Sequence, residues 1–217
     1  MNVARILYPV NVLGPGNRIG IWMVGCNRAC PGCSNPELWE QKPEYEIPVS
    51  RLIELIHSIS DKHQVDGFTI SGGEPMLQAS DLLKLITSLS DVSTDVLVYT
   101  GFSIEELNAN TDSGVQTLLK SISVLIDGEY VEELNNNSHL RGSSNQRIHI
   151  LMNQFESKYN DYITSGSNQI QNFTTTDGIV SVGIHHKSFY EEWHGRLHRQ
   201  MAQRTWYFYQ NQAVDLG

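Results

Sequence analysis

The chain has 217 residues, of which 40% are hydrophobic and 18% charged, and its formal net charge is −9. This length allows one domain with a sizeable core, and the acidic balance argues against a general nucleic-acid binder or an anionic-membrane binder. No run approaches the roughly 18–20 apolar residues of a membrane span, and the N-terminal apolar patch is too short for a signal peptide, so we expect a cytoplasmic protein.

The predicted elements alternate strands with helices along the chain. The apolar spacing predicts amphipathic helices over 50–60 and 80–90, capped by Ser50 and Ser80, and the SIEE segment from Ser103 predicts a capping box. This order predicts βαβ units and a parallel sheet, whose strand C-termini share one edge. The predicted strands are 18–24, 67–70, 95–100, 122–126, 147–152 and 178–184.

Two polar stretches, 135–139 and 156–177, are predicted to be loops. The second is long enough to be an excursion over a site or a partly disordered segment. The last segment, 178–203, is predicted to form a strand and then a helix with its apolar face on the sheet. We therefore treat residues 1–217 as a single domain.

All three cysteines, Cys26, Cys30 and Cys33, lie in the loop 25–36 after the first predicted strand. Clustered free thiols fit a reducing compartment. Three thiolates are one ligand short of a closed metal site. Zinc would need a fourth ligand, such as a histidine, whereas three corners of a 4Fe–4S cube leave one iron open. A structural or redox role without catalysis also fits.

A second motif, GGEP, follows the second predicted strand as Gly72, Gly73, Glu74 and Pro75. Such a glycine pair is common in the turn between a strand and a helix. Glycines at a strand end also allow a ligand close to the backbone, and a carboxylate beside them can accept from an ammonium group.

The order Cys-x3-Cys-x2-Cys followed by GGEP resembles the radical S-adenosylmethionine superfamily. The resemblance implies that Cys26, Cys30 and Cys33 hold a 4Fe–4S cluster whose open iron binds S-adenosylmethionine. It also implies that the GGE motif holds the amino group of that cofactor. The fold it implies is a partial (β/α)6-type parallel barrel, with cluster and cofactor at the rim formed by the strand C-termini.

The wider string GCNRACPGCSNPELW resembles the activating enzymes of anaerobic ribonucleotide reductase. The residue before the third cysteine is often aromatic in the superfamily, but here it is Gly32. This departure occurs in members that carry the variant CPGC. Asn35 fits the string of the activating enzymes. Further similar strings are VYTGFSIEEL, VLIDGEYVEEL and LRGSSNQRI, and the likeness is weakest across 153–177. Through these strings the resemblance implies cofactor contacts for Thr100, Gly101, Asp127 and Ser144.

Some of these strings also have simpler interpretations. Asp127 with its following glycine fits a plain turn, and RGSSNQR fits a solvated loop in which Arg147 pairs with a surface carboxylate. His194 and His198, one helical turn apart, fit a solvated face, and His185 and His186 are weaker site candidates.

The resemblance implies that a reduced cluster passes one electron to S-adenosylmethionine, and that the resulting 5′-deoxyadenosyl radical abstracts hydrogen from a glycine of a partner enzyme. The partner would be an anaerobic ribonucleotide reductase, and a low-potential donor would supply the electron. If one cluster uses all three cysteines, none is left to bind a second cluster. This favours a minimal activase with a single cluster. Two alternatives are a radical enzyme that modifies a peptide or small molecule, and a metal-binding module without catalysis.

Overall fold

The computed structural model describes residues 1–175, 178–187 and 189. The chain divides into two units, Met1–His185 and His186–Gly217. Of the second unit, the described part shows the Phe189 N–H donating to the His186 carbonyl oxygen at 2.9 Å. The helix expected near the C-terminus, with its two histidines, lies outside the described residues.

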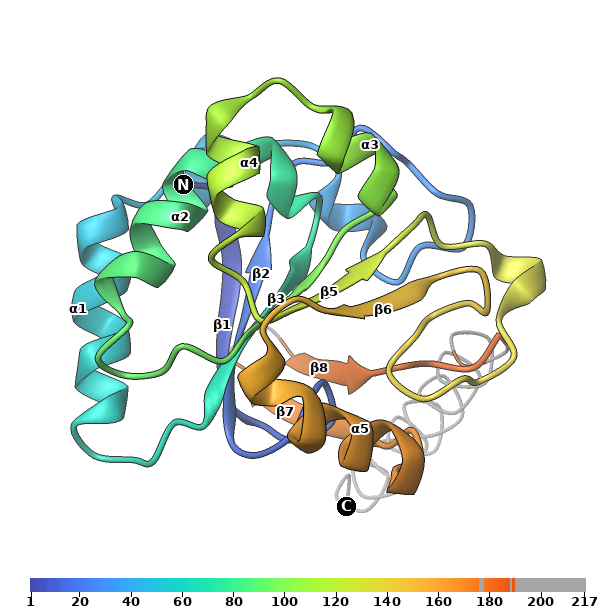
Figure 1. Cartoon of the computed structure of the whole chain (residues 1–217). Coiled ribbons are helices and arrows are strands. Elements are labelled where there is room, and N and C mark those ends of the chain that lie inside the picture. The colour runs from blue at the N-terminus through green and yellow to red at the C-terminus, as the bar shows by residue number, and fades with distance from the viewer. Residues whose placement is uncertain (176–177, 188, 190–217) are drawn as a thin grey trace, which may run out of the picture. The chain divides into compact units, whose positions relative to one another are not determined.

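A six-stranded sheet in the order β1-β2-β3-β4-β5-β6 forms the centre of the first unit (Figure 1). Strands β2 to β5 are parallel, which confirms the α/β class, whereas β1 and β6 are antiparallel to their neighbours. That this sheet curves into a partial barrel remains a prediction. The strands are β1 (Val3–Val10), β2 (Arg18–Met23), β3 (Gly67–Gly72), β4 (Val96–Tyr99), β5 (Val124–Asp127) and β6 (Arg147–Ile150).

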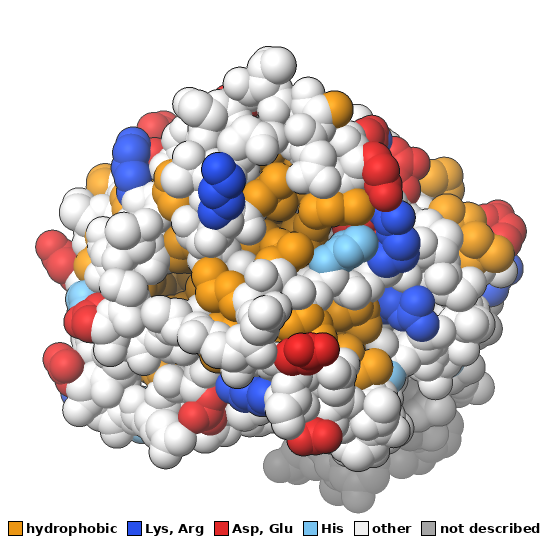
Figure 2. All heavy atoms as spheres, in the orientation of Figure 1, with side chains coloured by type: hydrophobic (Ala, Val, Ile, Leu, Met, Phe, Trp, Pro, Cys, Tyr) orange, Lys and Arg blue, Asp and Glu red, His pale blue; other side chains and the backbone are white. Residues whose placement is uncertain are grey.

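The strands expected at 147–152 and 178–184 do not continue the parallel part of the sheet. The chain returns from β5 to β6 through 128–146, which contains only one short 3-10 turn, so β6 lies antiparallel beside β5. The strand expected at 178–184 is β8 (Gly178–Gly183), which pairs with β7 (Ile170–Thr175) in a two-stranded sheet of its own. In Figure 2, apolar side chains gather over the region of β6, the edge strand of the main sheet.

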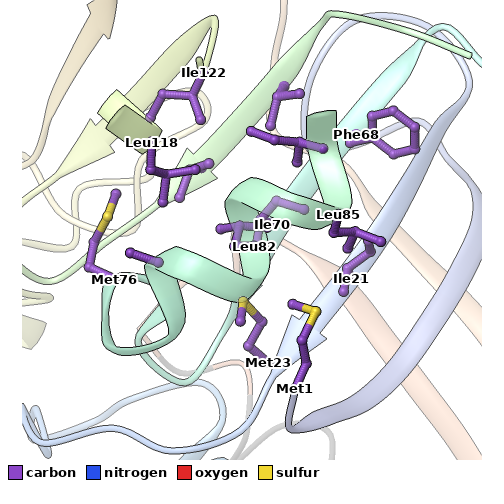
Figure 3. Close-up of a cluster of buried hydrophobic side chains, with 14 of the residues drawn as sticks. Met1, Ile21, Met23, Phe68, Ile70, Met76, Leu82, Leu85, Leu118 and Ile122 are labelled. Atoms are coloured by element: carbon purple, nitrogen blue, oxygen red, sulfur yellow. The ribbon is translucent and has the colours of Figure 1, made fainter. Parts of the chain in front are cut away.

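Two amphipathic helices cover one face of the main sheet. Leu52 and Ile56 of α1 are buried in one cluster with Leu82 and Leu85 of α2. Figure 3 shows Leu82 and Leu85 beside strand residues such as Ile70. Burial of these apolar side chains is the main favourable contribution to folding. The helices are α1 (Val49–Ser60), α2 (Ala79–Ser88), α3 (Ile104–Ala109), α4 (Ser113–Leu119) and α5 (Glu156–Ser165); 3-10 turns are η1 (Pro36–Leu38), η2 (Pro43–Tyr45), η3 (Pro75–Gln78), η4 (Glu132–Leu134) and η5 (Asn153–Phe155).

The helix starts differ in part from the sequence expectation. The predicted caps Ser50 and Ser80 are wrong, because the N-cap positions of α1 and α2 are Pro48 and Gln78, and neither side chain makes a capping hydrogen bond. The chain is already wound as η3 when it enters α2, so Ser80 lies inside the helix. The capping box at Ser103 is confirmed. The Ser103 hydroxyl accepts from the N–H of Glu106, and the Glu106 carboxylate accepts from the N–H of Ser103. None of the helices in the described ranges is long and apolar enough to cross a membrane.

Helix α5 and the β7–β8 pair cover the opposite face of the sheet. Tyr159 of α5 is buried with Leu97 and Val124, and Val182 of β8 is buried with Trp22. The stretch 156–177 is therefore mostly helix and strand rather than the loop that its polar composition indicates. Its apolar positions form only a narrow stripe on α5, and β7 has only two, Ile170 and Phe173, so polar side chains dominate the pattern although burial alternates along the strand.

A buried ion pair lies on this face at the N-terminal end of the parallel strands. Arg18 is fully buried, and its Nη2 lies 3.1 Å from Oδ1 of Asp95. Tyr159 and Lys158 of α5 each donate to that carboxylate at 2.6 Å. Burial alone raises the pKa of Asp95, but Arg18 and the two α5 donors outweigh it and hold the pKa below its ordinary value. The pair therefore fastens α5 to the sheet.

Candidate functional site

The motifs singled out in the sequence meet at one edge of the sheet. The cysteine loop follows β2, GGEP closes β3, Thr100 and Gly101 follow β4, and Asp127 ends β5. Because β2 to β5 are parallel, their C-terminal ends lie at the same edge. The prediction that these segments share one edge is confirmed, and such edges are where α/β folds bind ligands.

The cysteine loop is held in a closed shape by its own backbone. Gly25 and Cys26 donate to the carbonyl oxygens of Leu38 and Trp39 at 2.8 and 2.9 Å, which joins the start of the loop to the chain that leaves it. Ala29 has φ 47°, an uncommon value for a residue with a side chain, and it turns the chain between the first two cysteines. The loop is therefore preorganised rather than extended.

All three cysteine thiols are free and half-buried. The backbone N–H of Arg28 donates to the Cys26 sulfur, and that of Asn35 donates to the Cys33 sulfur, each at 3.4 Å. Burial raises the pKa of the Cys30 thiol, and a hydrogen bond from the backbone of Tyr130 lowers it in part. The sulfurs of Cys26 and Cys33 thus each have a backbone donor, an arrangement that stabilises negative charge on thiolates.

The donor set on this loop fits an iron–sulfur cluster, for which cysteine thiolates are the usual ligands. Within the described part of the chain, no three Cys, His, Asp or Glu side chains converge on a site for one metal ion. A 4Fe–4S cube is a different kind of site, because each cysteine binds a different iron.

Gly72 and Gly73 bring the end of β3 against the start of the cysteine loop. The N–H groups of Gly73 and Glu74 donate to the carbonyl oxygens of Met23 and Gly25, both at 2.7 Å. A Cβ atom at Gly73 would lie 2.4 Å from the Gly25 oxygen, so only glycine fits this approach. The glycine pair therefore has a packing role whether or not a ligand binds beside it.

Glu74 is buried, with 1% of its surface exposed. Its Oε1 accepts from the N–H of Met76 at 2.9 Å and from the Thr100 hydroxyl at 2.8 Å, and its Oε2 accepts from the N–H of Gly101 at 2.7 Å. Burial raises the pKa of Glu74, and these hydrogen bonds offset part of that effect. Pro75, also buried, opens the 3-10 turn η3 directly after it.

Sequence reasoning did not single out Arg28, which lies inside the cysteine loop. Its guanidinium lies 4.0 Å from the centre of the Phe102 ring and forms two ion pairs of 2.9 Å, with Glu106 and Glu129. It thereby contacts the segments that follow β4 and β5. The only signal in the sequence was a cation between two cysteines, which does not indicate partners about a hundred residues away.

Asp127 lies at the same edge, but protein groups surround its carboxylate. It accepts from the N–H of Ile104 at 2.7 Å and from Nη2 of Arg147 at 2.6 Å, and Nε2 of His149 lies 3.1 Å away. Burial raises its pKa, but the hydrogen bond from Arg147 and the other donors hold the pKa below its ordinary value. Arg147 also pairs with the exposed Glu105, as the solvated-loop interpretation of RGSSNQR predicts.

The RGSSNQR run mainly holds its own loop in shape. The buried Gln146 accepts from the N–H groups of Gly142 and Ser143 at 2.9 and 3.2 Å, and donates to the Gly128 carbonyl oxygen at 2.9 Å. Ser144 is exposed, and its N–H donates to the Leu134 carbonyl oxygen at 2.9 Å. The run thus ties the segment before β6 to the segment after β5.

Gly32 and Asn35 lie on the outer part of the cysteine loop. Gly32 is exposed with φ 72°, and a Cβ atom there would lie 2.9 Å from Cδ of Glu132. Its positive φ disfavours a side chain at this position, so glycine suits the backbone here. Asn35 is half-buried and precedes η1, where its backbone contacts the last cysteine.

Comparison with known proteins gives a family match and several relatives. Residues 12–149 match the family described as 4Fe-4S single cluster domain, a range that includes the whole cysteine loop and GGEP. The anaerobic ribonucleoside-triphosphate reductase-activating protein of Escherichia coli (strain K12) is 33% identical over 151 residues, which is 66% of this chain and 96% of that protein. The proteins of the same name from Vibrio cholerae serotype O1 (strain ATCC 39315 / El Tor Inaba N16961) and Enterobacteria phage T4 are 32% and 30% identical, over 65% and 68% of this chain and 94% and 93% of theirs.

Proposed function

We infer the function of this chain from the family to which it belongs, that of the anaerobic ribonucleoside-triphosphate reductase-activating proteins. We propose that it is a radical S-adenosylmethionine oxidoreductase that activates an anaerobic ribonucleotide reductase. When bound, the cluster and S-adenosylmethionine supply a reductive cleavage whose 5′-deoxyadenosyl radical abstracts hydrogen from a glycine of that partner. This chain's own residues bind and orient these groups.

The observation that carries the proposal is the set of three free thiols on one preorganised loop, beside the GGE segment at the shared edge. Cys26, Cys30 and Cys33 would hold the cluster. The backbone N–H groups directed at the sulfurs of Cys26 and Cys33 favour the thiolate form that cluster binding requires.

Glu74 would bind the cofactor's ammonium group. Three hydrogen bonds fill three of the about four acceptor positions of its carboxylate, which leaves one on Oε2 for an ammonium donor. Thr100 and Gly101 hold Glu74 in place and so act on the cofactor through it. We assign the remaining contacts with the cofactor to Gly32, Asn35, Gly72, Gly73 and Pro75, and to Asp127 and Ser144 through the loops that they support.

The partner's glycine segment would approach the same edge, since that is where the loops after β2, β3, β4 and β5 meet. A low-potential electron donor completes the system. Both requirements fit an anaerobic cytoplasm, where free thiols persist.

The proposal is tested by anaerobic reconstitution with iron and sulfide, followed by dithionite reduction with S-adenosylmethionine. We expect 5′-deoxyadenosine from the wild type and none from Cys30→Ala. A well-loaded cluster that yields no 5′-deoxyadenosine would indicate a metal-binding module without catalysis.

Mixing the activated protein with an anaerobic ribonucleotide reductase tests the partner. We expect the electron paramagnetic resonance doublet of a glycyl radical on the reductase. Formation of 5′-deoxyadenosine without that doublet would favour a radical enzyme that modifies a peptide or a small molecule.

A further inference from the structure

Arg28 lies between the first two cysteines, and its guanidinium is held on three sides. The ring centre of Phe102 is 4.0 Å away, Nη1 lies 2.9 Å from the Glu129 carboxylate, and Nη2 lies 2.9 Å from that of Glu106. We call these three partners the Arg28 clamp. An isolated surface ion pair contributes little to stability. A planar guanidinium stacked on a ring and bonded on two sides, with only 18% of the side chain exposed, has a much more definite geometry.

The aliphatic stem of Arg28 is also packed closely. A Cβ atom at Gly101 would lie 3.0 Å from Cγ of Arg28 and 3.4 Å from Oε2 of Glu74. The stem therefore lies on the residue whose N–H donates to the Glu74 carboxylate. Through this contact and the clamp, the side chain of Arg28 is fixed along its whole length.

The backbone of the same residue contacts a cysteine. The N–H of Arg28 donates to the Cys26 sulfur at 3.4 Å. The next residue, Ala29, has φ 47°, a backbone conformation that persists only where surrounding contacts enforce it. The clamp supplies such contacts, and it does so from the segments after β4 and β5. Because the N–H and the clamped side chain belong to one residue, fixing the side chain limits the directions that the N–H can take.

We propose that Arg28 is a positioning residue: its clamped side chain holds its own N–H on the Cys26 sulfur and thereby raises the reduction potential of the bound cluster. This inference rests on the proposed function, because it requires a 4Fe–4S cluster on the three cysteines. A donor to a ligand sulfur stabilises the reduced cluster more than the oxidised one, because the reduced cluster carries more negative charge. Loosening the clamp would therefore lower the midpoint potential.

Two variants loosen the clamp without changing the charge of the protein. Phe102→Leu removes the ring beside the guanidinium, and Arg28→Lys keeps the positive charge but not the planar group that bonds on two sides. The constant charge matters because a change of charge near a cluster by itself shifts its potential. The matched control is Phe155→Leu. Like Phe102, Phe155 is half-buried against a hydrophobic cluster, but it lies in η5 and packs with the cluster that contains Tyr159.

The midpoint potential is measured by a redox titration that follows the paramagnetic signal of the reduced cluster. We expect a more negative midpoint for Phe102→Leu and for Arg28→Lys, and the wild-type midpoint for Phe155→Leu. Because both changes act on one clamp, the double variant is expected to shift the midpoint by less than the sum of the single shifts. The proposal is overturned by a wild-type midpoint in either single variant, by an equal shift in Phe155→Leu, or by additive shifts in the double variant.

Hydrogen exchange of the Arg28 amide in the cluster-free protein gives a second readout, independent of activity. We expect faster exchange in Phe102→Leu than in the wild type and in Phe155→Leu. Equal exchange in the three proteins overturns the positioning role. Failure of the wild type to take up a cluster would instead contradict the proposed function, so the two failures can be told apart.

Discussion

Oε2 of Glu74 accepts a hydrogen bond from the backbone N–H of Gly101 at 2.7 Å, so the segment after β3 is joined directly to the segment after β4. The Thr100 hydroxyl adds a second link, to Oε1 at 2.8 Å. Both links are made by a carboxylate that is almost completely buried. Glu74 therefore stabilises two loops of the edge as well as being the candidate ligand for an ammonium group.

Glu74→Ala is expected to lower the free energy of unfolding by about 2–4 kcal/mol, since the N–H groups of Met76 and Gly101 lose their acceptor. The matched variant Thr100→Val removes a hydroxyl that donates to Glu74 and accepts from the N–H of Phe102, and it is expected to cost about 1–2 kcal/mol. Urea unfolding of the cluster-free proteins measures both. Wild-type stability of Glu74→Ala would show that the carboxylate has no structural role, whatever its effect on cofactor affinity.

Gly32→Ala is expected to reduce both stability and iron uptake, because φ 72° and the side chain of Glu132 both disfavour a Cβ atom there. The backbone part costs about 1–2 kcal/mol. When Glu132→Ala is added to Gly32→Ala, we expect recovery of the stability lost to the steric contact, but not of the stability lost to the backbone conformation. The control is Ala29→Gly, at φ 47° in the same loop, which is expected to leave stability nearly unchanged. Iron and sulfide content after reconstitution and urea unfolding test this, and equal results for the two positions would contradict it.

Gln146→Leu is expected to destabilise the loop between β5 and β6 by about 2–3 kcal/mol, because the N–H groups of Gly142 and Ser143 lose their acceptor. Amide exchange should quicken at those two residues first. Asn145→Ala, at an exposed neighbouring position, is the control and is expected to cost less than about 1 kcal/mol. Unchanged exchange in Gln146→Leu would show that the loop is held by other contacts.

Asp95→Asn is expected to lower the free energy of unfolding by about 3–5 kcal/mol at neutral pH, because it leaves the buried Arg18 without its counter-ion. Burial raises the pKa of Asp95, but Arg18, Lys158 and Tyr159 together hold it below the ordinary value of 3.8. Its contribution to stability is thus complete above the ordinary pKa and is lost as the pH falls through the folded value. The difference between wild type and variant should shrink below about pH 4.

Urea unfolding at several pH values measures this difference. Lys158→Met, which removes a partner that is 38% exposed, is expected to cost less than about 1 kcal/mol. A wild-type advantage that persists undiminished at low pH would contradict the depressed pKa of Asp95.

Local sequence patterns were sufficient to predict the parallel strands at the centre of the fold and the position of the motifs at one edge of the sheet. Apolar runs separated by amphipathic helices predict βαβ units, and parallel strands place whatever follows them at one edge. The same patterns failed for β6, whose direction depends on a loop without a crossover helix. They also failed for α5, whose narrow apolar stripe is hidden among polar residues.

The sequence by itself determined the chemistry of the donors: three thiols within eight residues, a glycine pair and a carboxylate, each directly after a predicted strand. Only the tertiary structure decided what these groups contact. Arg28 and Glu129, 101 positions apart, meet because β2 and β5 end at the same edge, and the same packing brings the side chain of Glu132 against Gly32. Such contacts depend on how distant segments pack, whereas periodicity and spacing report only on neighbours along the chain.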